Sequence, residues 1–432
     1  MRSAVPKVMH KIGGRPMLGH VLAAADAAGA TRRAVVVGPE AEAVRDYIRE
    51  EAPDAASYVQ SERLGTAHGV LAARKEFKND PDEILILYGD TPLLTAKTLG
   101  RMRKALAKGA DVAVFGFRSA NPTGYGRLIV EKKQLVAIRE EKDASKSERE
   151  IDFCNAGVMG FRGSAARLLK KIGKDNAKGE YYLTDLVAIA NKAGLKVVAL
   201  EGEESEFIGV NSRIELAAAE RVFQDRARQA AMSGGVTMIA PETVWFSHDT
   251  KLGRDVTIEP NVFFGPGVSV AASVTIRANS HIEAARIASG AIIGPFARLR
   301  PGADIGLNAH IGNFVEIKNA RIEEGAKANH LSYVGDAHVG AAANIGAGTI
   351  TCNYDGFDKH LTKIGAGAFV GSNSALVAPV HIGAGAYVAT GSVVTMDVPD
   401  DAMAVARGRQ TNKPEWATNL REKKGGKRSQ PK

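Results

Sequence analysis

Cysteine is scarce in this chain, and long hydrophobic runs are missing. Its 432 residues include two cysteines, Cys154 and Cys352, which can form no disulfide framework and lack the spacing of a metal site. The longest aliphatic runs, such as Ile84–Leu87, are far shorter than the roughly 20 residues of a membrane-spanning helix, and the first residues hold no apolar signal core. We therefore expect a cytoplasmic protein without an integral membrane segment.

A strong excess of one charge is also missing from most of the chain. The net charge is +9, but residues 421–432 hold six basic side chains and one acidic side chain, so this tail alone contributes +5. The other 420 residues carry +4, which is weak evidence for a polyanionic partner, and we expect no nucleic-acid partner. We expect residues 421–432 to form a basic, disordered tail, while phosphorylated small molecules fit the mild positive charge.

Short apolar runs typical of strands alternate with helical patterns up to about residue 211. The runs cover 34–38, 84–88, 112–117 and 195–200, and the helical patterns include 16–28, 41–50 and 164–171. This alternation predicts an α/β sheet. Residues 212–232 are rich in Ala, Glu and Arg, contain no internal Gly or Pro and end at Gly234-Gly235, which predicts one long connecting helix.

A period of six residues begins after Gly235. Large apolar residues occupy every sixth position, first at Leu252, Ile258, Phe264, Val270, Ile276 and Ile282, and later at Ile364, Val370, Leu376, Ile382, Val388 and Val394. One inward side chain in six suits a solenoid of short strands with glycine and small residues at its corners. Two stretches interrupt the period, because Ile322–Val334 is out of step and Thr351–Lys363 is an insertion of the kind that often forms a binding loop.

Two titratable residues stand out from position alone. His330 lies in the out-of-step stretch, with Arg300 and Lys318 on preceding repeats, and an imidazole there is either a surface residue or a base for an attacking amine. Asp90 follows Ile84–Leu87 at the expected carboxyl end of a buried parallel strand, where α/β sheets bind ligands. A helix cap or a turn aspartate is the alternative for Asp90.

Four motifs in the solenoid resemble one known family. They are LRPGADIG (299–306), NFVEIKNA (313–320), NHLSYVGDA (329–337) and NIGAGTITCNYDG (344–356). They are similar to the bacterial bifunctional enzymes of UDP-N-acetylglucosamine synthesis, in which a glucosamine-1-phosphate N-acetyltransferase is joined to an N-acetylglucosamine-1-phosphate uridyltransferase. The resemblance implies an α/β, Rossmann-like nucleotidyltransferase domain over 1–211, a linker helix over 212–233 and a left-handed parallel β-helix over 234–420. It also implies a homotrimer.

The resemblance assigns a set of residues to acetyl transfer from acetyl-CoA to the amine of glucosamine-1-phosphate. His330 matches the general base of the family. Arg300 and Lys318 match cations that bind the sugar phosphate, and Tyr333 and Asn344 match sugar contacts. The positions that match the acetyl-CoA site are Asn353, Tyr354, Ser372, Thr390 and Arg407. Alanine is common in the family where this chain has Thr390, and we expect the threonine to be tolerated.

A second set of residues matches uridyl transfer from UTP to N-acetylglucosamine-1-phosphate. Asp90 and Asn211 match the ligands of Mg²⁺, which prefers carboxylate and amide oxygens, and Asn211 is also a substrate contact. Lys7 matches a lysine that contacts phosphate. The uracil contacts match Gln60, Gly65 and Thr66, and the sugar contacts match Gly126, Glu140 and Asn155.

The resemblance departs from the family pattern at the first residue. Members of the family have a strand and a glycine-rich L-A-A-G-x-G-T-R loop before the methionine that corresponds to Met1, and the loop supplies backbone N–H groups and an arginine to the nucleotide phosphates. We therefore expect a translation start upstream of Met1 and weak uridyl transfer by the chain as it stands. The alternatives are an acetyltransferase with an inactive first domain, a nucleotidyltransferase for another sugar phosphate, and a non-catalytic assembly protein. The presence of Asp90, Asn211 and His330 argues against the last.

Overall fold

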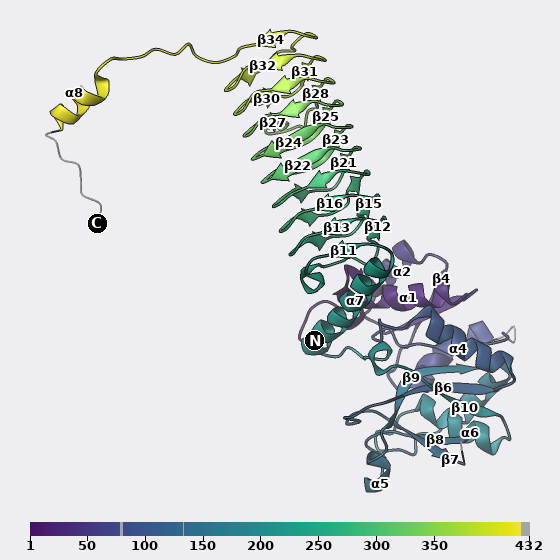
Figure 1. Ribbon diagram of the computed structural model, residues 1–432. Coiled ribbons are helices and arrows are strands. Elements are labelled where there is room, and N and C mark those ends of the chain that lie inside the picture. Colours follow the sequence, from purple (N-terminus) through teal and green to yellow (C-terminus); the bar gives the residue numbers. More distant parts are fainter. Residues whose placement is uncertain (78–80, 133, 425–432) are drawn as a thin grey trace. The chain divides into compact units, whose positions relative to one another are not determined.

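The computed structural model describes residues 1–77, 81–132 and 134–424 (Figure 1). Its contacts divide the chain into two compact units. The first unit consists of Met1–Ala230 and Phe246–His248, and the second of Ala231–Trp245 and Asp249–Lys432. Within the described residues, no helix is long and apolar enough to cross a membrane.

The first unit is built around a mixed sheet, which confirms the expected α/β class. The strand order is β10 (Val197–Glu201), β6 (Val112–Arg118), β9 (Phe153–Phe161), β7 (Arg127–Glu131) and β8 (Gln134–Arg139). β10 is parallel to β6, and β9 is antiparallel to β6. Shorter strands lie outside this order: β1 (Lys11–Ile12) with β2 (Arg15–Pro16), and β3 (Arg33–Val37) in parallel with β4 (Ala55–Val59).

The strand before Asp90 differs from the expectation. β5 (Ile84–Ile86) pairs antiparallel with β9 and is half-buried, so the prediction of a buried parallel strand is wrong. A run of aliphatic residues indicates a strand with apolar neighbours, but it does not indicate whether the neighbouring strand is parallel or antiparallel. Asp90 still follows this strand closely, which keeps it at an edge of the sheet.

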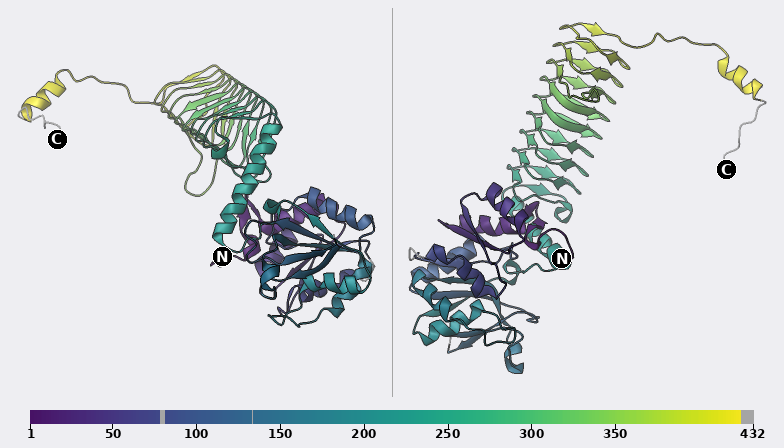
Figure 2. Two further views of the ribbon diagram at one scale, coloured as in Figure 1. Left: turned by 60° about the horizontal axis from the view of Figure 1, so that its bottom comes forward. Right: turned by 180° about the vertical axis from the view of Figure 1, so that it is seen from behind.

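Helices cover the sheet of the first unit (Figure 2, left). The helices are α1 (Met17–Ala27), α2 (Glu42–Glu51), α3 (Thr66–Ala72), α4 (Ala96–Ala107), α5 (Lys146–Arg149) and α6 (Leu186–Lys192). The 3-10 turns are η1 (Lys7–Met9), η2 (Arg74–Phe77), η3 (Gly163–Lys171), η4 (Leu183–Asp185) and η5 (Glu204–Glu206), so the expected α-helix over 164–171 is a 3-10 helix. Leu99 and Met102 of α4 pack in one buried cluster with Phe115 of β6. A second cluster contains Val112 and Leu186.

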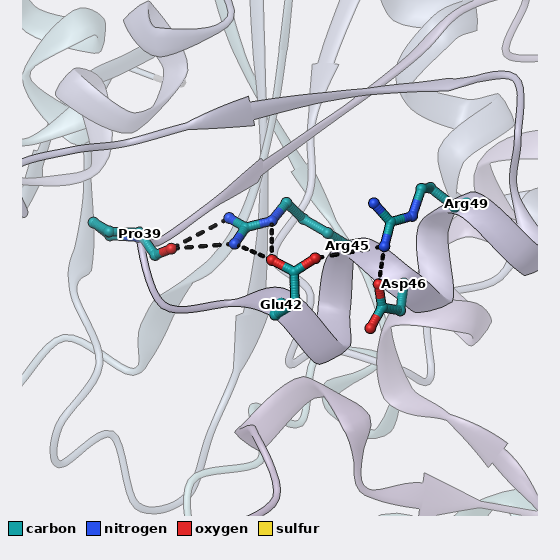
Figure 3. Close-up of polar contacts among 5 residues, drawn as sticks. All are labelled: Pro39, Glu42, Arg45, Asp46 and Arg49. Carbon is teal, nitrogen blue, oxygen red and sulfur yellow. Dashed lines mark hydrogen bonds and ion pairs between the residues drawn. The ribbon is translucent and has the colours of Figure 1, made fainter.

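Ion pairs form on the exposed face of α2 (Figure 3). Arg45 contacts the Glu42 carboxylate at 2.6 Å and also donates to the Pro39 carbonyl, while Arg49 pairs with Asp46. Pairs at this helical spacing on an exposed surface add only a few tenths of a kcal/mol each, roughly 0.2–0.5. They fit a solvated helix face, and the opposite face buries Val44 and Ile48.

The expected connecting helix is α7 (Arg213–Ser233), whose start is fixed by reciprocal hydrogen bonds. The Glu215 amide donates to Ser212 Oγ at 3.2 Å, and the Ser212 amide donates to Glu215 Oε2 at 2.7 Å. Gln224 is buried in the middle of α7, where its side-chain amide bonds both the N–H and the C=O of Phe246 at 2.8 Å. These two hydrogen bonds explain why Phe246–His248 belongs to the first unit.

The second unit is a stack of short parallel strands, as the six-residue period predicts. Ile258, Ile276, Ile293 and Ile311 are partners in successive coils, and all four are completely buried. One sheet contains β11 (Thr237–Met238), β13 (Thr257–Ile258), β16 (Thr275–Ile276), β19 (Ile292–Ile293), β22 (His310–Asn313), β24 (Lys327–His330), β26 (Asn344–Ile345), β29 (Phe369–Val370), β32 (Tyr387–Val388) and β34 (Met403–Ala404). A short turn, η6 (Pro241–Thr243), follows β11.

The other faces of the stack join in a second sheet. It contains β12 (Lys251–Leu252), β14 (Phe263–Phe264), β15 (Ser269–Val270), β17 (His281–Ile282), β18 (Arg286–Ile287), β20 (Arg298–Leu299), β21 (Ala303–Ile305), β23 (Glu316–Ile322), β25 (Tyr333–Val339), β27 (Ile350–Cys352), β28 (Thr362–Ile364), β30 (Ala375–Val377), β31 (Val380–Ile382) and β33 (Val393–Val394). β23 and β25 each pair along two shorter strands, so they continue from one face to the next. The left-handed winding stays a prediction.

Both interruptions of the period have a structural cause. Ile311 pairs with Ala328, seventeen positions later, so the coil is one residue shorter than three repeats and an alanine takes the inward place. Ile345 pairs with Val370, because the insertion lengthens that coil. Its residues leave the stack as a loop that closes on itself between Tyr354 and Lys359.

One corner of the stack contradicts the expectation of small corner residues. Phe296, Phe314 and Leu331 occupy equivalent places in successive coils with φ of 55°, 57° and 51°. This left-handed conformation costs a residue with a side chain roughly 1–2 kcal/mol. The side chains point outward, with exposed fractions of 48%, 54% and 61%, and the two phenyl rings stack at 5.1 Å. We call these three residues the apolar corner.

The chain continues beyond the stack to helix α8 (Trp416–Lys423), in which every residue is exposed. The basic tail expected over 421–432 begins inside α8. Residues 425–432 lie outside the described residues.

Candidate functional sites

Three predicted residues of uridyl transfer meet beside the sheet edge. Lys7 lies in η1, Asp90 follows β5 and Asn211 precedes α7. Lys7 Nζ lies 2.5 Å from Asp90 Oδ2 and 2.9 Å from Asn211 Oδ1. A carboxylate and an amide oxygen therefore converge on one cation, which is the donor set that Mg²⁺ accepts.

The segments that carry the two oxygens are held by backbone hydrogen bonds. The Val210 amide donates to the Asp90 carbonyl at 2.9 Å, which ties the two segments together. The Asn211 amide donates to Glu215 Oε2 at 2.6 Å. Burial opposes the charge of Glu215, but the hydrogen bonds from Asn211 and Ser212 outweigh it and lower the pKa of this carboxyl. Sequence reasoning missed Glu215, although the S-x-x-E capping pattern could have found it.

The predicted sugar contacts also form one cluster. The Asn155 amide donates to the Gly126 carbonyl at 2.7 Å, and a Cβ on Gly126 would lie 3.4 Å from Glu140 Oε2. Glu140 Oε1 accepts a hydrogen bond from Thr184 Oγ1 at 3.0 Å, and burial raises the pKa of Glu140. Glycine at 126 leaves open the space between Asn155 and Glu140 that a Cβ would enter.

Arg127, next to Gly126, is a positioning residue that the sequence did not reveal. It is 1% exposed and lies 2.8 Å from Glu141 Oε2. It also donates to the carbonyls of Tyr125 and Arg149. Arg127 therefore joins the glycine turn to the segment that carries Glu140.

Tyr88 lies close to both of these clusters. Burial raises its pKa to about 12, and the charges of Glu140 and then Asp90 act in the same direction. Its ring packs on Gly157, which has φ of 72° and where a Cβ would come within 2.6 Å of the ring. The tyrosine of the YGD motif is thus a neutral group that fills the space near two carboxylates.

The predicted uracil contacts are gathered in one loop. Gln60 Nε2 donates to the Gly65 carbonyl at 3.0 Å, and Thr66 Oγ1 accepts from the Leu183 amide at 2.9 Å. Gly65 has φ of 115°, and a Cβ there would lie 2.5 Å from the Tyr181 carbonyl oxygen. The loop therefore requires glycine at 65, and the amide nitrogen of Gln60 is already engaged within it.

His330 is oriented by a residue that the sequence analysis missed. It ends β24, and its Nδ1 lies 2.7 Å from Asn313 Oδ1, on the preceding coil. Either nitrogen of a neutral imidazole can carry the proton. With an amide oxygen as its acceptor, Nδ1 carries it, and Nε2 keeps the free electron pair that a base requires. A search for polar residues one coil before His330 could have found Asn313.

Cationic groups lie on the neighbouring face of the stack. Arg300 Nη1 donates to Glu316 Oε1 at 2.8 Å, and chiefly this hydrogen bond raises the pKa of Arg300. Lys318 pairs in register with Gly335, where a Cβ would lie 2.3 Å from Tyr333 Oη. Lys318 and the Tyr333 hydroxyl are therefore neighbours on this face.

Asn344 is placed apart from this group. It lies on β26, whose partners are Lys327 on one side and Phe369 on the other. That sheet is not the sheet that contains Lys318 and Tyr333. Among the described residues, no hydrogen bond joins Asn344 to the other predicted acetyl-transfer residues.

The insertion is anchored by the predicted acetyl-CoA residue Asn353. This residue is 7% exposed, and its Nδ2 donates to Asp336 Oδ2, while Asn319 Nδ2 donates to Asp336 Oδ1 at 2.6 Å. Burial alone would raise the pKa of Asp336, but these hydrogen bonds outweigh it and lower the pKa. The Asn353 side chain thus holds the loop in place from inside.

The loop itself is organised by Asp355. Its carboxylate accepts from the Phe357 and Asp358 amides at 2.8 and 2.7 Å and pairs with His360 Nε2 at 2.7 Å. The hydrogen bond from His360 is the largest cause that holds the pKa of Asp355 far below its usual range. Tyr354 is 60% exposed and donates from Oη to the Gly356 carbonyl at 2.6 Å.

The remaining predicted acetyl-CoA residues lie one above another. Gly371 and Ser372 lie one coil before Thr390, and the Gly391 amide donates to the Ser372 carbonyl at 2.8 Å. Arg407 Nη1 donates to the Thr390 carbonyl at 2.9 Å. The structure therefore brings Ser372, Thr390 and Arg407 together, with the backbone of Thr390 rather than its side chain making the contact.

Comparisons with known proteins agree with both units. Residues 1–151 match the MobA-like NTP transferase domain. Residues 361–395 match the bacterial transferase hexapeptide family, and residues 255–284 match the hexapeptide repeat of succinyl-transferase. Fold and sites together define a nucleotidyltransferase unit followed by a hexapeptide transferase unit.

Full-length relatives identify the family. The bifunctional protein GlmU of Azorhizobium caulinodans is 61% identical over 426 residues, which is 98% of this chain and 95% of the relative. The bifunctional protein GlmU of Xanthobacter autotrophicus is 60% identical over 433 residues, covering 100% of this chain and 96% of the relative. The chain belongs to the GlmU family. This confirms the expected class, a bifunctional acetyltransferase and uridylyltransferase of UDP-N-acetylglucosamine synthesis.

Proposed function

We propose that His330 is the general base of acetyl transfer. The amine of glucosamine-1-phosphate attacks the thioester carbonyl of acetyl-CoA, a C–N bond forms, the C–S bond breaks and the CoA thiolate leaves. His330 Nε2 takes the proton that the amine gives up. The observation that carries this proposal is the 2.7 Å contact between His330 Nδ1 and Asn313, which leaves Nε2 available.

The other acetyl-transfer residues have supporting roles in this proposal. Arg300 and Lys318 bind the sugar phosphate, because fixed cations offset its charge. Tyr333 and Asn344 contact the sugar. The acetyl-CoA site is formed by Asn353, Tyr354, Ser372, Thr390 and Arg407, with Asn353 acting through the anchored insertion and Arg407 close to the CoA phosphates.

We also propose that the protein is a homotrimer whose acetyl-transfer site is shared between copies. Two observations support this. The apolar corner exposes three large side chains directly beside His330, and a monomer would leave them in water. Asn344 lies on a different sheet from Lys318 and Tyr333, and in this proposal the Asn344 of a second copy reaches the sugar that these two residues contact.

For uridyl transfer, we propose that Asp90 and Asn211 hold Mg²⁺ and that Lys7 contacts phosphate. Gln60, Gly65 and Thr66 bind uracil, and Gly126, Glu140 and Asn155 bind the sugar. When bound, the metal neutralises charge on the phosphates of UTP, while the residues of the chain position the sugar phosphate for in-line attack on the α-phosphorus. The convergence of Asp90 and Asn211 on one cation is the observation that supports this assignment.

In this proposal, uridyl transfer belongs to residues 1–211 and acetyl transfer to residues 234–420, with 212–233 as the linker. We place both reactions in the cytoplasm. The substrates are glucosamine-1-phosphate, acetyl-CoA, UTP and N-acetylglucosamine-1-phosphate, and we propose no nucleic-acid partner.

The decisive experiment for acetyl transfer compares two histidine variants. His330→Ala should lower kcat by about 10²–10⁴ because the general base is lost. His281→Ala is the matched control, since His281 is an exposed histidine on β17 of the same stack, and it should keep normal turnover. Normal acetylation by folded His330→Ala protein would show that another group is the base.

A further inference from the structure

The ammonium group of Lys7 stands at the point where the two proposed metal ligands converge. Its Nζ is 2.5 Å from Asp90 Oδ2 and 2.9 Å from Asn211 Oδ1. The side chains of Lys7 and Asp90 are 38% and 24% exposed, so the ion pair is open to solvent. A dissolved cation can therefore reach the same oxygens.

The backbone segments that carry the two oxygens are held in place independently of Lys7. Asp90 is joined through its carbonyl to the Val210 amide at 2.9 Å. Asn211 is joined through its amide to Glu215 at the start of α7. Lys7, in contrast, reaches the pair by a flexible four-carbon stem that can turn elsewhere without moving the backbone.

One oxygen pair cannot serve both cations at once. Mg²⁺ binds its ligands at about 2.0–2.1 Å and keeps several waters, which would overlap the position of the Lys7 ammonium. Two positive charges at such a distance also repel each other.

We propose that Lys7 and the divalent metal are alternative occupants of the Asp90–Asn211 pair. This inference rests on the proposed metal site. Without metal, Lys7 neutralises Asp90 and holds the two side-chain oxygens together. When the metal enters, Lys7 is released and becomes free to contact phosphate, so that its phosphate-binding role begins only with the metal in place.

Metal titration tests this exchange directly. Binding of Mn²⁺ to the full chain is measured by water-proton relaxation for wild type, Lys7→Met, Lys11→Met and Asp90→Asn. Lys7→Met should tighten Mn²⁺ binding by about fivefold, which corresponds to one exposed ion pair. Lys11→Met removes the same charge from an exposed lysine on β1 and should leave the affinity within about twofold of wild type.

A chemical readout follows Lys7 itself. Acetylation of lysines by a water-soluble amine reagent, quantified by peptide mass spectrometry, should increase at Lys7 when Mg²⁺ is added and stay constant at Lys11. If Asp90→Asn loses Mn²⁺ binding while Lys7→Met binds like wild type and Lys7 labelling ignores Mg²⁺, the exchange is wrong and the metal site stands. If Asp90→Asn binds Mn²⁺ like wild type, the metal site itself is wrong and the exchange with it.

Discussion

His330 Nδ1 and Asn313 Oδ1 lie 2.7 Å apart, although 17 residues separate them in the sequence. One coil of the stack accounts for this spacing, because Asn313 and His330 are register partners on adjacent strands β22 and β24. The contact joins a titratable ring to a neutral amide, so it orients the ring without adding a charge. In the proposed mechanism, this contact fixes which ring nitrogen of His330 takes the proton.

Replacing Asn313 by leucine should lower kcat of acetyl transfer, because the proton of His330 is then free to occupy either ring nitrogen. The loss should be smaller than the about 10²–10⁴ expected when the base itself is removed. Asn313→Asp should move the pH of half-maximal turnover upward, since a carboxylate stabilises the protonated imidazole, and only the neutral ring is a base. A pH–rate profile identical to that of wild type for Asn313→Asp would contradict the orienting role.

The side chain of Tyr333 can be moved by a substitution at another residue, Gly335. A Cβ on Gly335 would lie 2.3, 2.5 and 2.8 Å from Oη, Cζ and Cε1 of Tyr333, so Gly335→Ala should push the hydroxyl end of the ring aside. The KM for glucosamine-1-phosphate should rise by about 2- to 12-fold, the equivalent of one lost hydrogen bond. Gly173→Ala is the control, because Gly173 is exposed in the first unit, its φ is not positive and a Cβ there would meet nothing within 4 Å. An unchanged KM in Gly335→Ala would exclude Tyr333 as a sugar contact.

The apolar core of the stack was predictable from the sequence, whereas the residues at its corners were not. Ile258, Ile276 and Ile293 face inward in every coil because a solenoid buries the same position of each repeat, and a sequence pattern shows this directly. Phe296 and Phe314 adopt a left-handed corner conformation that no local preference of phenylalanine announces. Because these side chains point outward, the size limit that applies to side chains inside the stack does not apply to them.

The resemblance named the candidate site residues, but it did not predict the contacts among them. The resemblance paired Asp90 with Asn211 as metal ligands, but 83 and 204 residues separate Lys7 from these two residues, and only the folded chain shows that Lys7 meets them. Asn353 was predicted as an acetyl-CoA residue, but its side chain turns inward to Asp336. A match to a motif identifies a residue position, but it does not show whether the side chain contacts the ligand or supports a loop.

Asp355 should make the insertion sensitive to acid. Its pKa is lowered in the folded loop, chiefly by the hydrogen bond from His360, so the order that it provides is complete above the ordinary aspartate range, near pH 4, and is lost as the pH falls further. Asp355→Asn should raise the KM for acetyl-CoA at neutral pH while leaving the melting temperature of the stack nearly unchanged, because the loop is exposed. Proteolysis of the loop, followed by mass spectrometry, should become faster in the variant. Equal cleavage rates in variant and wild type would contradict this account of the loop.

Arg127 offers a test of the sugar cluster in the first unit. The side chain is buried, pairs with Glu141 at 2.8 Å and joins the segments that carry Gly126 and Glu140. Removing one partner of a fully buried ion pair costs about 3–5 kcal/mol, but the Glu141 side chain is 31% exposed, so water compensates part of the charge that is left. Arg127→Met should therefore lower the free energy of unfolding of the first unit by less than that amount. In the double variant Arg127→Met, Glu141→Gln the uncompensated charge is gone, so part of the stability should return, while binding of UDP-N-acetylglucosamine, measured by calorimetry, should stay weak because Gly126 and Glu140 are no longer held together. Additive effects of the two substitutions on stability would show that the pair is not coupled, and wild-type binding by the double variant would show that Arg127 does not position the sugar cluster.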